Sequence, residues 1–160
     1  MPKAQFQIRP VRNAEDLSAT VGLFRAYAAS LGIDLTYQDF EAELAGMPGK
    51  YAPPRGELLL ARKAGGEPIG CVALRAIEPD GCCEMKRLYV SPEARGSGLG
   101  RVLVEAVIEA AKRKDYREIR LDTLPDMIEA QALYERLGFA RIAPYYDTPI
   151  VGTVFMARAL

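Results

Sequence analysis

Histidine is absent from this chain of 160 residues. Its absence excludes Ser–His–Asp and Cys–His nucleophilic catalysis and every zinc site that uses an imidazole ligand. The three cysteines, Cys71, Cys82 and Cys83, are too few for an all-thiolate zinc site within one chain. Because their number is odd and two are adjacent, they indicate free thiols in a reducing compartment rather than disulfides. We therefore expect no metal site.

The chain also lacks net charge and long apolar runs. Lysine plus arginine and aspartate plus glutamate number 21 each, which provides no basic surface for nucleic acid or anionic membranes. No apolar run approaches the ~20 residues that span a bilayer. The first residues, MPKAQFQIRP, lack the apolar core of a signal peptide. We expect a cytoplasmic protein with neither a nucleic-acid nor a membrane partner.

The composition is ordinary for a globular protein, with 49% hydrophobic and 26% charged residues. No repeat or second domain appears, so residues 1–160 are expected to form a single domain. Hydrophobic periodicity predicts strands at 6–11, 57–63, 68–77, 82–90, 117–124, 139–146 and 152–160, and helices at 13–31, 36–47, 99–114 and 126–137. This order, βααβββαβαββ, predicts an α/β fold with a mixed sheet.

A glycine-rich segment, SPEARGSGLGR, directly precedes the third predicted helix. Helix N-termini present unpaired N–H groups and a partial positive charge, so they bind anions readily. Gly96, Gly98 and Gly100 allow close approach of the backbone to a ligand, and Arg95 and Arg101 add full charges. The segment therefore predicts a diphosphate site, although a glycine-rich turn without a ligand is the alternative.

Two motifs in this arrangement resemble those of the GCN5-related N-acetyltransferase (GNAT) superfamily. The first is Arg/Gln-x-x-Gly-x-Gly/Ala, and the second is an aromatic residue near the end of the following helix before Gly-Phe. The matching residues are Arg95, Gly98 and Gly100, then Tyr134, Gly138 and Phe139. The resemblance implies an acyl-CoA N-acyltransferase fold, in which a mostly antiparallel, splayed sheet is flanked by helices.

The resemblance further implies that acetyl-CoA is the co-substrate. The backbone of Leu88, Tyr89 and Val90 would pair with the pantetheine arm, and one of its N–H groups would polarise the thioester carbonyl. The pyrophosphate would be held by Arg95, Gly96, Ser97, Gly98, Leu99, Gly100 and Arg101. One departure from the family is Met127, because many relatives carry an asparagine there that contacts the pantetheine.

In this family an amine attacks the thioester directly in a ternary complex, so a base and an acid are needed. Tyr134 matches the tyrosine that donates a proton to the leaving thiolate, and a core tyrosine is the alternative. For the base we favour Glu84, where histone acetyltransferases of this family carry glutamate, with Asp122 as the second candidate. The alternatives are a strand carboxylate paired with Lys86 for Glu84, and an acceptor for turn amides for Asp122.

The acceptor amine would lie across the splay, between residues 31–37 and 144–150. Two acids among aromatic and aliphatic residues suit a small cationic amine or the amino group of an amino acid, and ordinary loop residues are the alternative. The acidic and aromatic members of these segments are Asp34, Tyr37, Tyr145, Tyr146 and Asp147.

The function implied is acyl-CoA-dependent N-acetylation of a primary amine of a small molecule or amino acid. Two other functions remain open, namely a non-catalytic acyl-CoA-binding sensor or subunit and an acetyltransferase of protein N-termini or lysines. Tyr134 and Glu84 argue against a mere binder, since a binder needs neither. The neutral charge gives no sign of docking to basic tails, and the apolar last strand is compatible with a homodimer.

Overall fold

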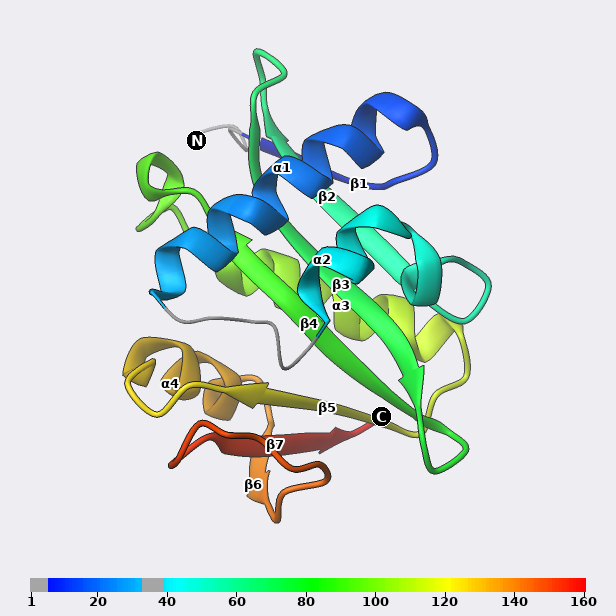
Figure 1. Cartoon of the computed structure of the whole chain (residues 1–160), viewed down its shortest axis with the longest axis vertical. Helices are drawn as coiled ribbons and strands as arrows, with labels where there is room; N and C mark the ends of the chain where they lie inside the picture. Colours follow the sequence, from blue (N-terminus) through cyan, green and yellow to red (C-terminus); the bar gives the residue numbers. More distant parts are fainter. Residues whose placement is uncertain (1–5, 33–38) are drawn as a thin grey trace.

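A computed structural model of the chain describes residues 6–32 and 39–160. The strands form one seven-stranded sheet with helices on both faces (Figure 1). They are β1 Phe6–Pro10, β2 Glu57–Lys63, β3 Pro68–Ile77, β4 Cys82–Val90, β5 Glu118–Thr123, β6 Ala140–Ile142 and β7 Val154–Ala159. The helices are α1 Ala14–Leu31, α2 Phe40–Ala45, α3 Leu99–Arg113 and α4 Ile128–Arg136, with 3-10 turns η2 Gly49–Tyr51 and η3 Pro92–Ala94. The predicted α/β order is confirmed.

The sheet runs in the order β1-β2-β3-β4-β5-β7-β6, and every neighbouring pair is antiparallel except β4 and β5. The parallel pairing joins residues 82–84 of β4 to residues 118–120 of β5. Beyond Glu84 the two strands diverge (Figure 1). Within the described ranges, residues 85–90 therefore have a strand neighbour on the β3 side alone. The expected splay is confirmed.

Two apolar cores lie on opposite faces of the sheet, with α1 and α2 in front of it and α3 behind it in Figure 1. Leu74, Leu103 and Ile119 are fully buried on the α3 side. Phe24 and Tyr51 are buried on the α1 side. Because side chains alternate along a strand, β3 and β4 contribute to both cores. No helix in the described ranges has the length and apolar character needed to cross a membrane.

β4 carries one extra residue opposite β3. Lys86 pairs with Ala73 and Tyr89 pairs with Cys71, so two residues of β4 face one residue of β3 between these pairs. The first of the two, Arg87, has a φ of 58°, in the left-handed region. This arrangement is a β-bulge, and such bulges redirect side chains next to functional sites.

Several boundaries near the C-terminus differ from the prediction, and the larger differences are at α4 and β6. Asp126 and Glu129 predict a capping box, but the residue that caps α4 is Met127, without a side-chain bond to the helix. The strand predicted at 139–146 is shorter and forms β6, Ala140–Ile142. The rest of that segment is a loop whose tyrosine hydroxyls bind carboxylates on the sheet, as described below.

The second predicted helix is also shorter. Its expected start near Thr36 falls in residues 33–38, outside the described residues. The described helix α2 ends before Gly46, and Met47 lies in the turn that follows. Pro48 explains this end, because the residue before a proline disfavours helical backbone.

Candidate active site

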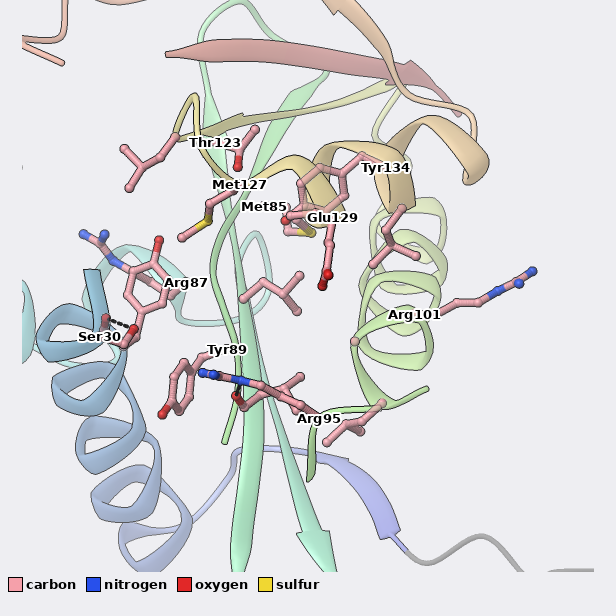
Figure 2. Close-up of a pocket in the computed structure, with 18 of the residues that line it drawn as sticks. Ser30, Met85, Arg87, Tyr89, Arg95, Arg101, Thr123, Met127, Glu129 and Tyr134 are labelled. Atoms are coloured by element: carbon pink, nitrogen blue, oxygen red, sulfur yellow. Dashed lines mark hydrogen bonds between the residues drawn. The ribbon is translucent and has the colours of Figure 1, made fainter. Parts of the chain in front are cut away.

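A cavity of about 610 Å³ opens where β4 and β5 diverge (Figure 2). Its walls come from α1, the second half of β4, residues 94–101, the end of β5, and α4. The volume is within the range of small-ligand sites, ~300–1,000 Å³. All of the residues predicted to bind the cofactor or to act in catalysis line this cavity, apart from Glu84 and Ser97.

The glycine segment, residues 95–101, closes one end of the cavity. Gly96 and Gly98 have φ values of 83° and 84°, with open space where a Cβ would lie. Over the described chain, the N–H groups of Gly96, Gly98 and Gly100 have no backbone acceptor. The first amide of α3 with such an acceptor belongs to Val102, 3.2 Å from the carbonyl oxygen of Gly98. The segment therefore presents unpaired amides that suit an anion.

The two arginines of this segment are oriented differently. Arg95 is held at the cavity, since its Nε donates to the carbonyl oxygen of Val90 at 3.1 Å. Its guanidinium lies 6.0 Å from the ring centre of Tyr89. Arg101 extends away from β4 in Figure 2 and pairs with Glu105 at 3.5 Å. Arg95 is therefore the better-placed charge for a ligand in the cavity.

The second half of β4 offers a free strand edge to the cavity. Val90 pairs with Gly70 and Tyr89 pairs with Cys71 on the β3 side. On the other side, where β5 has diverged, Leu88, Tyr89 and Val90 line the cavity. Main-chain groups at such an edge can pair with an extended, amide-containing ligand.

Tyr134 reaches the cavity from α4. It is 5% exposed, and its ring packs against Phe139 with 5.9 Å between ring centres. Burial, and then the nearby Tyr27 and Asp122, raise the pKa of this phenol, so it keeps its proton at neutral pH. Its hydroxyl makes no hydrogen bond with any residue that the structure describes. The proton is therefore available to a ligand.

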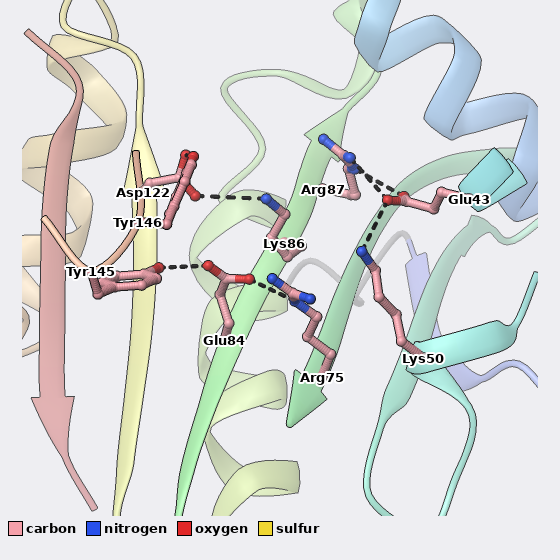
Figure 3. A network of polar contacts seen from close by, with 9 residues as sticks. All are labelled: Glu43, Lys50, Arg75, Glu84, Lys86, Arg87, Asp122, Tyr145 and Tyr146. Atoms are coloured by element: carbon pink, nitrogen blue, oxygen red, sulfur yellow. Dashed lines mark hydrogen bonds and ion pairs between the residues drawn. The ribbon is translucent and has the colours of Figure 1, made fainter. Parts of the chain in front are cut away.

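Asp122 lines the same cavity from β5. The hydroxyl of Tyr146 donates to its Oδ2 at 2.7 Å, and Nζ of Lys86 lies 3.8 Å from its Oδ1 (Figure 3). These contacts orient the carboxylate while its side chain stays 14% exposed. The structure thus brings Asp122 and Tyr134 together in one cavity.

Glu84 is completely buried and does not line this cavity. Nε of Arg75 donates to its Oε1 at 2.8 Å, and the hydroxyl of Tyr145 donates to its Oε2 at 2.6 Å. Burial alone would raise the pKa of Glu84, but the charges of Lys86 and Arg75 and the bond from Tyr145 outweigh it and lower that pKa. Glu84 is therefore a weakened base, engaged on both oxygens.

A third buried carboxylate, Glu43 of α2, could not be assigned from the sequence. Arg87 donates to both of its oxygens at 3.0 Å, and Nζ of Lys50 lies 3.6 Å from Oε1 (Figure 3). The local signal was the group of charged residues Glu84, Lys86 and Arg87 inside a strand that is otherwise apolar, which indicates buried ion pairs. The partner is 44 residues away along the chain and carries no motif.

The family is decided by sequence comparison. The model of the Acetyltransferase (GNAT) family matches residues 23–139. An uncharacterized N-acetyltransferase of Schizosaccharomyces pombe is 41% identical over 98% of this chain and 96% of its own length. This chain belongs to the GNAT family.

Two further comparisons agree with this assignment. The crystal structure of a Klebsiella pneumoniae protein, assigned as an acyl-CoA N-acyltransferase, has a TM-score of 0.77 and 29% identity and covers 99% of both chains. An N-acetylaspartate synthetase of Danio rerio is 30% identical over 79% of this chain, which corresponds to 45% of that relative. The protein is thus an acyl-CoA-dependent N-acyltransferase of GNAT type.

The predicted acceptor side of this GNAT protein is partly described. Residues 33–38, with Asp34 and Tyr37, lie outside the described residues. Tyr145 and Tyr146 hold the carboxylates described above, and Asp147 is exposed. Across residues 6–32 and 39–160 no group of side chains is arranged to hold a metal ion.

Met127 lines the cavity, at the position where many relatives are expected to carry an asparagine. A thioether is a weak acceptor and has no N–H group. This GNAT protein therefore offers an apolar contact at that point in the cavity wall.

Proposed function

We propose that this protein transfers the acetyl group of acetyl-CoA to a primary amine of a small molecule, including amino acids, within one ternary complex. The observation that carries the proposal is the cavity itself. It joins the unpaired amides of Gly96, Gly98 and Gly100, a free strand edge at 88–90, and the pair Asp122 and Tyr134. A phosphate site, a strand-pairing site and an acid–base pair are what this transfer requires.

The cavity fits the co-substrate that the family uses. Amides of the glycine segment, with Arg95, would bind its phosphates, because nothing occupies the space where a Cβ of Gly96 or Gly98 would lie. The main chain of Leu88 and Val90 would pair with the amide-containing arm. When bound, acetyl-CoA supplies an activated acyl thioester, so no protein nucleophile is needed.

We propose Asp122, rather than Glu84, as the group that removes the proton of the amine. Asp122 lines the cavity and is partly exposed, whereas Glu84 lies outside the lining with both oxygens engaged. The lowered pKa of Glu84 also weakens it as a base. The sequence alone favours Glu84, so this proposal reverses the order of the two candidate bases. An amine held beside Asp122 would lose its proton to the carboxylate directly or through one water.

Tyr134 is proposed as the acid that protonates the leaving sulfur. Its raised pKa keeps the phenol protonated, and its hydroxyl has no partner among the described side chains that would compete for the proton. A thiolate leaving group gains most from a donor already in place, because proton transfer then needs no rearrangement. The buried ring packed on Phe139 fixes the direction of the hydroxyl.

An amino acid is a reasonable acceptor on comparative grounds. Relatives in Danio rerio and Homo sapiens are N-acetylaspartate synthetases, which are 30% and 33% identical to this chain over the matched regions. Since this chain covers 45% and 32% of those proteins, their substrate is a guide for choosing amines and no more.

The test is amine-dependent release of free thiol from acetyl-CoA over a panel of primary amines. We expect release with the wild type, and a loss of about 10²–10⁴-fold in Tyr134→Phe with unchanged affinity for coenzyme A by calorimetry. Tyr116→Phe is the matched control, because that hydroxyl donates to the carbonyl oxygen of Arg55, outside the cavity lining. Binding of acetyl-CoA without release for any amine would indicate a non-catalytic acyl-CoA-binding protein instead.

A further inference from the structure

A row of charged side chains crosses the α2-facing side of β3 and β4 next to the cavity (Figure 3). Cations outnumber carboxylates in this row by four to three. The cations are Lys50, Arg75, Lys86 and Arg87, and the carboxylates are Glu43, Glu84 and Asp122. Counted over the described residues, the row therefore carries one excess positive charge.

The excess is concentrated at Lys50. The carboxylate that it pairs with, Glu43, is already held on both oxygens by Arg87. Burial, and then the positive charge of Arg75, lower the pKa of Lys50 more than Glu43 raises it. Lys50 thus shares one carboxylate and faces other cations, an arrangement that an added anion would relieve.

Lys50 and Arg75 are the more exposed cations of the row, whereas Lys86 and Arg87 are buried in the wall of the cavity. The side chains of Lys50 and Arg75 are 41% and 31% exposed, against 8% for Lys86 and 3% for Arg87. Arg75 lines a separate hollow of about 460 Å³ together with Tyr145, and Arg55, Glu78 and Asp80 line it as well. The hollow therefore gives a ligand access to Arg75 from solvent.

The spacing along β4 relates this charge to the proposed base. Glu84, the partner of Arg75, lies two residues before Lys86, the partner of Asp122, on the same face. Two residues of strand span ~7 Å. β3 and β5 lie on opposite sides of β4, each ~5 Å from it, so a molecule with its amine at Asp122 would need an extended chain of several bonds to bring a second group to the ends of the long Arg75 and Lys50 side chains.

We propose that the acceptor is a carboxylate-bearing amine, an amino acid whose acid group binds between Lys50 and Arg75 while its amine faces Asp122. This inference rests on the proposed function and adds the substrate class. A carboxylate there would complete the charge balance of the row. A simple diamine would place a second positive charge against Lys50 and Arg75 and would be rejected.

The test compares acids with their amides, which have nearly the same shape. Kinetics of thiol release are measured for aspartate against asparagine, glutamate against glutamine, and β-alanine against β-alaninamide. We expect the wild type to prefer at least one acid over its amide by about tenfold or more in kcat/KM, since hydrogen bonds to charged groups contribute about that much. The free protein is also titrated with the same acids and amides by calorimetry.

Variants at Lys50 test whether the preference for acids over amides depends on the row of charged side chains. Lys50→Gln should raise KM for the preferred acid about tenfold, leave kcat and the amide nearly unchanged, and so remove the preference. Lys50→Arg should keep the preference because it keeps the charge. The matched control is Lys112→Gln, in which a lysine side chain of similar exposure, 43%, pairs with Glu109 on α3.

The outcomes separate this inference from the proposed function. Equal use of acids and amides, with release that still depends on Tyr134, would overturn the carboxylate site and leave the acetyltransferase proposal standing. Absence of release with every amine would overturn the proposed function, and calorimetry would then test the carboxylate site by itself. Binding of an acid by the wild type that is lost in Lys50→Gln would support the carboxylate site. No binding of any acid by the wild type would overturn the carboxylate site.

Discussion

The two faces of β4 are both buried, but by different kinds of side chain. Toward α3, Cys83 and Met85 join the aliphatic core. Toward α2, Glu84 and Lys86 join the row of ion pairs, although they are 0% and 9% exposed. The first face resembles any close-packed interior. The second face buries charges, and the attraction between paired charges offsets the free energy lost on removing them from water only in part.

The difference separates what holds the fold from what serves the reaction. Apolar packing would satisfy the α2-facing side of β4 at least as well as ion pairs do, so the charges there are explained by chemistry rather than by stability. They lie beside the cavity, and each carboxylate has a defined partner. Substitutions on the apolar face should therefore affect stability alone, whereas substitutions on the polar face should affect activity as well.

The largest effect is expected at Asp122 on the polar face. Asp122→Asn should lower kcat by about 10²–10⁴-fold and remove the rise of rate with pH, because the amide cannot accept the proton of the amine. Asparagine keeps the shape of the side chain, but the buried Lys86 loses the charge of its partner, so kcat is measured well below the unfolding temperature of the variant. Glu84→Gln is the matched control and should keep the pH–rate profile. A profile that changes with Glu84→Gln instead would restore Glu84 as the base.

Substitutions on the apolar face should lower stability and leave activity unchanged. Leu103 is fully buried between α3 and the sheet, and Leu103→Ala should lower the free energy of unfolding by about 2–5 kcal/mol through lost contacts and a cavity. The kcat of the folded protein should stay near the wild-type value. Val102→Ala, at a neighbouring position that is 39% exposed, should change stability by less than about 0.5 kcal/mol in the same denaturant titration.

Substitutions in the glycine segment should affect the binding of coenzyme A alone, an effect that neither face of β4 should show. Gly98→Glu should weaken coenzyme A binding by about 100-fold or more, because it brings a negative charge to the proposed phosphate site. Gly66→Glu controls for backbone strain, as Gly66 also has a positive φ, 99°, and open space around it, in the turn between β2 and β3. Unchanged affinity in Gly98→Glu by calorimetry would place the phosphates elsewhere.

The smallest effect concerns pH. The pKa of Glu84 is lowered in the folded protein, so the stability it contributes is present above the ordinary glutamate pKa of 4.5 and is lost as pH falls through the lower folded value. Tyr145→Phe removes a bond to this charge and should lower the free energy of unfolding by about 1.5–3 kcal/mol at pH 7. This loss of stability should become smaller below pH ~4.5, where the charge of Glu84 is itself being lost. Tyr116→Phe, which removes a bond to a neutral carbonyl, should cost the same at both pH values.

The order of elements and the glycine segment could be predicted from the sequence because both depend on local patterns. The strands Glu57–Lys63, Pro68–Ile77 and Cys82–Val90 have the predicted bounds, since alternating apolar residues and turn residues mark them. The start of α4 was wrong by two residues, because Asp126 satisfies the capping pattern without making the bond.

The partners within the polar row could not be predicted, because they are distant in sequence. Tyr145 and Glu84 are 61 residues apart, and Arg87 and Glu43 are 44 apart. No local pattern indicates which carboxylate meets which cation. The order of Glu84 and Asp122 as candidate bases depends on burial and on the splay, which are properties of the folded sheet.

The extra residue in β4 shapes the strand edge that lines the cavity. Lys86 and Tyr89 are three residues apart, yet both lie on the side of the sheet that α1 and α2 cover, because the extra residue interrupts the alternation of side chains. Removing Arg87 would restore the regular alternation with Leu88 opposite Val72, so residues 88–90 would keep their faces. The deletion should therefore straighten β4 and leave the buried carboxylate of Glu43 without the guanidinium that holds both of its oxygens.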